Sequence, residues 1–150
     1  VMEIMARLGA IPKIYPFPEL KDALKKGMFD AQENPVTIIF NSKLYEEQKY
    51  LLVTNHSYDA MPFVIRNDLW ENLSSKYKKI IIDAAKEASE FNRNLVKEQT
   101  LKYFEELKLK GMIINFPDLE EFKKVGNDVI NSFTIVYSED VMNELKPYIK

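Results

Sequence analysis

The stretch of sequence that decides the fold runs from residue 29 to residue 35 and reads Phe-Asp-Ala-Gln-Glu-Asn-Pro. The apolar pair Met28-Phe29 leads into it as a short buried strand, and Pro35 is expected to open a helix that reaches about Leu44. Proline is favoured at the first helical position because its missing N–H would have no partner there. Asn34 then becomes the N-cap residue, next to free N–H groups that can bind a carboxylate. The simpler interpretation is that Asn34 only caps the helix.

The residues on both sides of this stretch resemble the signature of a known family. The matching positions in the first block are Phe17-Pro18-Glu19-Leu20, Ala23-Leu24, Gly27 and residues 30–35. Those in a second block are Thr54-Asn55-His56, residues 62–65, Trp70 and Leu73-Ser74. Both blocks are similar, in residues and spacing, to the DctP-type solute-binding proteins of TRAP transporters. Ala31 replaces the family's customary glycine, so the turn before Gln32 must avoid a left-handed backbone.

The resemblance implies an α/β fold of the periplasmic-binding-protein type (type II, TRAP solute receptor), in which two lobes enclose a cleft. By this correspondence, residues 1–59 and 100–150 would form most of the second lobe. Residues 60–99 would supply a crossing strand and part of a long lobe-spanning helix that pack on the first lobe. The N-terminal lobe, and any signal peptide, would then lie outside this sequence.

The same resemblance implies a function. The chain would serve in a periplasmic or otherwise extracytoplasmic receptor that binds a small organic acid and delivers it to the membrane permease subunits of a TRAP transporter. Hinge closure of the lobes around the ligand would be its mechanism. The resemblance therefore predicts a binding protein. No catalytic constellation indicates an enzyme, and no cofactor or nucleic-acid partner is expected.

Five residues are predicted to bind the ligand. Asn34 corresponds to the family's carboxylate-binding asparagine, and Phe17 to an aromatic residue that lies against the ligand. Met61, with Tyr58 and Asp59 just before it, would tune specificity. The structural alternatives are a capping role for Asn34 and a core position for Phe17. The family's carboxylate-pairing arginine would precede this chain, because none of the arginines present (Arg7, Arg66 and Arg93) matches its position.

Composition excludes several other classes of protein. The net charge is −2 with both signs mixed, so no basic stripe indicates binding to nucleic acid or an anionic membrane. The sequence has no cysteine, which excludes disulfides and thiolate zinc sites. Its single histidine, His56, has no signalled partner for metal binding or catalysis and is expected to be structural.

The longest predicted element is a helix from Ser74 or Ser75 to about Lys110, roughly 50 Å long at 1.5 Å per residue. Its apolar residues keep a three- and four-residue spacing as far as Leu95 and resume with a shifted phase at Leu101. A helical interaction protein that forms a coiled coil is the alternative to the receptor. The phase shift near Glu98 argues against it, because coiled coils need sustained heptads.

Shorter elements complete the pattern. Strands are predicted at residues 11–15, 50–53, 63–65 and 112–116, and helices at 1–8, 18–26 and 118–136 and after Ser138. Asp118 and Glu121 predict a capping box for the third of these helices. Residues 62–65 and the apolar face of the long helix would be exposed in this chain alone, which predicts that it self-associates.

Overall fold

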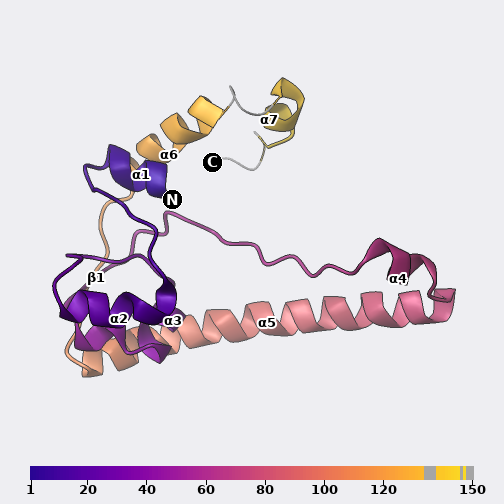
Figure 1. The fold of residues 1–150 in the computed structure, drawn as a ribbon, viewed down its shortest axis with the longest axis horizontal. Coiled ribbons are helices and arrows are strands. Elements are labelled where there is room, and N and C mark those ends of the chain that lie inside the picture. Colours follow the sequence, from indigo (N-terminus) through magenta and orange to yellow (C-terminus); the bar gives the residue numbers. More distant parts are fainter. Residues whose placement is uncertain (134–137, 146, 148–150) are drawn as a thin grey trace. The chain divides into compact units, whose positions relative to one another are not determined.

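The computed structural model describes residues 1–133, 138–145 and 147. The first half of the chain contains α1 (Met2–Arg7), α2 (Phe17–Lys25), α3 (Val36–Asn41), the 3₁₀ helix η1 (Leu44–Glu46) and β1 (Tyr50–Leu52). The second half contains α4 (Asn67–Glu71), α5 (Ser75–Leu109), β2 (Ile113–Asn115), α6 (Glu120–Phe133) and α7 (Glu139–Leu145). Figure 1 shows these elements along the chain. By its contacts the chain divides into two units, which are described separately.

The first unit comprises residues 1–17, 52–58 and the described residues from 115 onward. In it α1 packs against α6, on which Val129 is buried. The carboxylate of Asp118 accepts a hydrogen bond of 3.1 Å from the backbone N–H of Glu120, at the start of α6. This contact satisfies an N–H that the helix itself leaves unpaired, but it comes from Glu120 and not from Glu121, as the predicted capping box would need. Residues 134–136 of the helix predicted at 118–136 lie outside the described residues.

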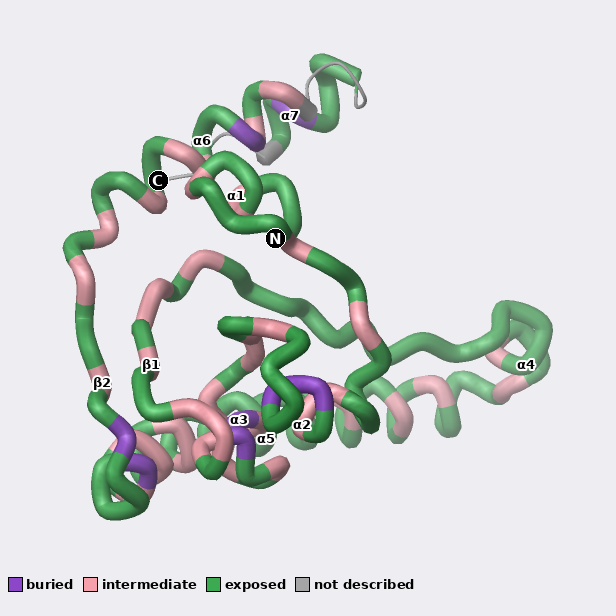
Figure 2. The backbone as a smooth tube through the Cα atoms, turned by 60° about the vertical axis from the view of Figure 1, so that its left-hand side comes forward, coloured by how far each residue is buried: buried purple, intermediate pink, exposed green. Residues whose placement is uncertain are grey.

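The second unit comprises residues 18–51 and 59–114 and contains the larger hydrophobic core. Leu24 of α2, Ile39 of α3, Leu44 of η1, Leu107 of α5 and Met112 are its buried members. In Figure 2 purple segments of this unit include parts of α2 and α3 and the residues just before β2. Helix α2 turns Ala23 and Leu24 inward and is followed by Gly27, which has a positive φ of 67°.

The long helix α5 is anchored to this core by its C-terminal end. Leu107 is fully buried, and the ring of Tyr103 stacks on Phe40 of α3 with 4.2 Å between the ring centroids. Gly111, with a φ of 91°, ends the helical path and lets the N–H of Met112 donate to the carbonyl of Leu107 over 3.0 Å. The predicted helix is therefore confirmed, with a length of 35 residues.

Most residues in the first half of α5 are exposed. Figure 1 shows α4 lying beside it, where Lys78 of α5 is 5.7 Å from the ring centre of Trp70 and 3.8 Å from a carboxylate oxygen of Glu71. Large apolar side chains on this half of α5 remain exposed, among them Tyr77, Ile80 and Phe91.

The strands β1 and β2 form a two-stranded sheet, as predicted for both segments. Ile113 N–H donates to the carbonyl of Lys49 over 2.8 Å, and Val53 N–H donates to the carbonyl of Asn115 over 2.9 Å. Both strands advance in the same direction between these two bonds, so the pairing is parallel. A parallel pair needs a long crossover connection, which here contains α4 and α5.

Three predicted strands are wrong. Residues 11–15, Met28-Phe29 and residues 63–65 form no strand, although each carries the apolar residues that favour one. A strand is completed by backbone hydrogen bonds to a neighbour, and among the described residues only β1 and β2 pair in this way. No helix in the described residues is both long enough and apolar enough to span a lipid bilayer.

Candidate functional site

The polar contact at the predicted carboxylate site joins Asn34 to Gln32. Asn34 Nδ2 donates a hydrogen bond of 2.6 Å to Gln32 Oε1, and both residues are half-buried. The prediction that Asn34 caps a helix opened by Pro35 is wrong, because the N-cap residue of α3 is Pro35 and no side chain caps this helix. The helix is also shorter than predicted: it ends at Asn41, and Leu44 begins the separate turn η1.

The backbone before Asn34 behaves as expected from the Ala31 substitution. Positive φ angles at residues other than glycine occur, among the described residues, at Lys43 and Asn55. Ala31 therefore avoids the left-handed conformation that a glycine would permit.

The other predicted ligand-binding residues are exposed. Phe17 is the first residue of α2, while Tyr58 and Met61 lie in an extended segment with 88% and 95% of their surface accessible. Asp59, between them, is exposed as well. Phe17 and Tyr58 belong to the first unit, and Asn34, Asp59 and Met61 to the second. The five residues are therefore divided between the two units, and their ligand-binding role stays a prediction.

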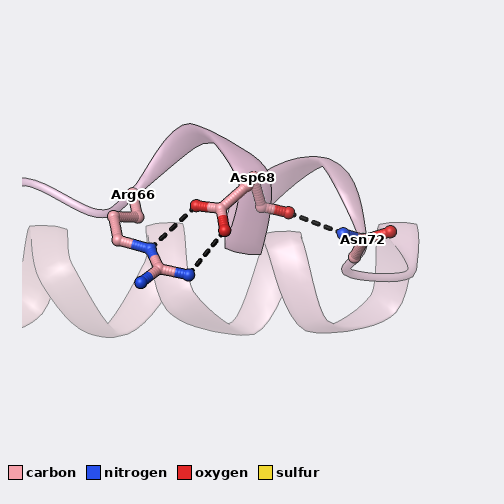
Figure 3. Close-up of polar contacts among 3 residues, drawn as sticks. All are labelled: Arg66, Asp68 and Asn72. Atoms are coloured by element: carbon pink, nitrogen blue, oxygen red, sulfur yellow. Dashed lines mark hydrogen bonds and ion pairs between the residues drawn. The ribbon is translucent and has the colours of Figure 1, made fainter.

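Arg66 and Arg7 each form an ion pair with a nearby carboxylate. Arg66 and Asp68 form a two-point ion pair at the start of α4, with Nε to Oδ1 at 2.8 Å and Nη2 to Oδ2 at 2.5 Å (Figure 3). The hydrogen bond from Arg66 lowers the pKa of the Asp68 carboxyl below its ordinary value. The Asp68 carbonyl in turn accepts from Asn72 Nδ2 over 2.7 Å. Arg7 pairs with Glu3 at 2.9 Å within α1.

The sequence predicts an exposed apolar surface on residues 62–65 and the long helix, and the structure shows a groove there. A groove of about 670 Å³ separates the segment before α4 from the first half of α5. Its apolar walls include Phe63, Ile65, Trp70, Ile81 and Ile82, and its polar lining includes Lys86, Glu90 and Arg93. The apolar run at residues 63–65 and the amphipathic pattern of the helix are the sequence features that correspond to this groove. None of the five predicted ligand-binding residues lines this groove.

His56 lies in an irregular segment of the first unit. Its Nδ1 is 2.5 Å from the hydroxyl of Thr54, and Asn55 between them has a left-handed φ of 46°. No cluster of three or more potential metal ligands occurs in the part of the chain that the structure describes.

Comparison with known proteins identifies the family. Residues 1–135 match the model of the DctP family, described as bacterial extracellular solute-binding proteins, family 7. The chain belongs to the DctP family.

One curated DctP relative is the 2,3-diketo-L-gulonate-binding periplasmic protein YiaO of Escherichia coli. It is 32% identical over 83% of this chain and 39% of its own length. A second relative, the sialic acid-binding periplasmic protein SiaP of Vibrio cholerae, is 30% identical over 91% of this chain and 43% of its own length. The chain thus spans about two fifths of the length of these relatives.

Solved structures confirm the fold prediction. A TRAP periplasmic solute-binding protein from Ochrobactrum anthropi, with its C-terminus bound in the ligand-binding pocket, matches with a TM-score of 0.85 and 30% identity. The match covers 99% of this chain and 47% of that one. A second such protein, from Polaromonas and bound to D-erythronate, has a TM-score of 0.78 and 32% identity over 89% of this chain and 44% of its own. The described helices and small sheet therefore have part of the fold of a TRAP solute-binding protein.

Proposed function

We propose that this chain serves in an extracytoplasmic receptor that binds a small organic acid and delivers it to the permease of a TRAP-type transporter. The observation that carries the proposal is the DctP-family match over residues 1–135. The names of the relatives agree with it, since one binds 2,3-diketo-L-gulonate and another was solved with D-erythronate, and both ligands are acids.

The chemistry of residues 29–35 supports an acid as the ligand. Asn34 uses one N–H for Gln32, and a primary amide carries two N–H donors and an acceptor oxygen. The second N–H can therefore bind a carboxylate oxygen, in a hydrogen bond strengthened by the charge of the ligand. Phe17, Tyr58, Asp59 and Met61 are the residues proposed to contact the rest of the ligand.

We assign the charge partner of the ligand to a part of the receptor outside this chain. Arg66 and Arg7 are paired with Asp68 and Glu3, and Arg93 lines the groove beside α5. Residues 1–59 and 100–150 are proposed to form the second lobe, and residues 60–99 to pack on the first. The exposed side chains of residues 63–65 and of α5, and the groove between them, support this second assignment because such apolar surface marks an interaction site.

A thermal-shift experiment tests the proposed function. The receptor, in the form that the cell makes, is heated with succinate, 2,3-diketo-L-gulonate, D-erythronate, and the neutral sugars glucose and ribose. An acid at 100 times its dissociation constant is expected to add about 2.7 kcal/mol to the free energy of unfolding. Shifts with the neutral sugars and none with any acid would refute the proposal.

A matched pair of variants then tests Asn34. Asn34→Ala is expected to weaken binding of the acid by roughly 1.5–3 kcal/mol, the range for a hydrogen bond to a charged group. Asn41→Ala, at the exposed C-terminal end of α3, is the control and should leave affinity unchanged. If Asn34→Ala binds the acid as tightly as Asn41→Ala does, Asn34 does not contribute to ligand binding.

A further inference from the structure

The side chain of Gln32 contacts that of Asn34, the residue that the proposed function places at the ligand. Asn34 Nδ2 donates a hydrogen bond of 2.6 Å to Gln32 Oε1 in a partly buried setting. Asn34 makes no capping bond to α3, so the helix itself does not hold its side chain. The contact with Gln32 is then the interaction that orients the amide.

The orientation matters because an amide has two different ends. The torsion that turns the amide of an asparagine is broad and weakly restricted, so an unheld side chain exchanges its oxygen and nitrogen between two directions. With Nδ2 held by Gln32, the oxygen and the remaining N–H have fixed positions. A ligand then meets a donor that is already oriented, and less conformational entropy is lost on binding.

We propose that Gln32 is a positioning residue, which orients the amide of Asn34 for the carboxylate of the ligand and does not itself touch the ligand. This inference rests on the proposed function. It gives Gln32 a role different from that of the five residues predicted to bind the ligand.

The contact can be tested without any ligand. In the receptor labelled with ¹⁵N, the side-chain amide protons of Asn34 are compared in the wild type and in Gln32→Met, which keeps the length of the side chain but removes the acceptor. The proton that bonds to Gln32 is expected to move upfield in Gln32→Met, while the side-chain amide protons of Asn41 stay in place. Unchanged Asn34 signals would overturn the inference.

A double-mutant cycle tests the functional part. Calorimetry measures the affinity of Gln32→Met, Asn34→Ala and the double variant for whichever acid of the thermal-shift panel gives the largest shift. Gln32→Met is expected to weaken binding between about twofold and tenfold, the scale of ordering one side chain. In the Asn34→Ala background the same change is expected to have no further effect, because Gln32 acts through Asn34.

Each remaining outcome decides the question. If the losses of affinity multiply in the double variant, Gln32 acts independently of Asn34 and the inference is overturned. If Gln32→Met binds as tightly as the wild type, the inference is also overturned, although the receptor still binds its acid. If no acid raises the unfolding temperature of the wild-type receptor, the proposed function itself is refuted. That outcome differs from a failure of the inference alone, in which the wild-type receptor still binds an acid.

Discussion

Replacing Leu107 by alanine should remove much of the stability of the second unit. Leu107 lies in the last turn of α5 with 0% of its surface exposed, among Leu24, Ile39, Leu44 and Met112. It is thus the residue that fastens the end of α5 to the rest of this core.

The expected size of the effect follows from the atoms removed. The change deletes about three buried carbon atoms, each worth about 0.8 kcal/mol of transfer free energy, or about 2.4 kcal/mol together. The cavity that remains adds a further loss, which gives about 3 kcal/mol and lies within the range of roughly 2–5 kcal/mol for such changes. Whole domains are stable by only about 5–15 kcal/mol, so the change is large.

Urea unfolding followed by circular dichroism measures this loss. Leu109→Ala is the matched control, because Leu109 is in the same turn of α5 but is 82% exposed. The two substitutions change helix propensity equally, so their difference isolates burial. A loss below about 1 kcal/mol in Leu107→Ala, or equal losses in both variants, would refute the packing described for this core.

Three further predictions concern the surface and the site. The pKa of Asp68 is lowered by Arg66, so their contact stabilises the folded chain above the ordinary pKa of aspartate and is lost as the pH falls through the lowered value. A ¹³C titration of the Asp68 carboxyl should give a higher pKa in Arg66→Met, and an unchanged pKa would show that the pair does not form in solution. The 150-residue chain should self-associate in light scattering at high micromolar concentration, and Phe91→Glu should weaken this association, because Phe91 is a large exposed apolar residue of α5. A monodisperse wild-type monomer would contradict this prediction. Asn34→Asp should bind the organic acid more weakly than Asn34→Ala in calorimetry, since it sets a negative charge against the carboxylate, and full affinity would show that Asn34 does not contact the ligand.

The features of the fold that could be predicted from sequence are those that local chemistry decides. Gly27 and Gly111 end their helices in left-handed conformations, and Asp118 accepts the N–H at the start of α6. The strand predicted at residues 63–65 failed because its apolar residues describe a surface to be covered, while a strand also needs a neighbouring backbone. The pattern of apolar residues can be read from the sequence, whereas the presence of a neighbouring strand depends on the rest of the fold.

The candidate site shows the same limit at the level of one side chain. The Asn34-Pro35 pair predicted a helix cap, yet the Asn34 amide bonds to Gln32 and the helix starts one residue later. Two polar side chains two residues apart can satisfy each other, and the capping rule takes no account of that competition. The family resemblance supplied the five ligand-binding residues, and their roles stay predictions.

The anchoring of α5 at one end gives it the properties of a lever. Its buried contacts are concentrated around Leu107, while Ser75 lies about 48 Å away along a continuous helix. A rotation of about 5° at Leu107 would therefore displace Ser75 by about 4 Å, given the helical rise of about 1.5 Å per residue. A small change of direction at Leu107 becomes, at the other end of the helix, a displacement comparable to the width of a side chain.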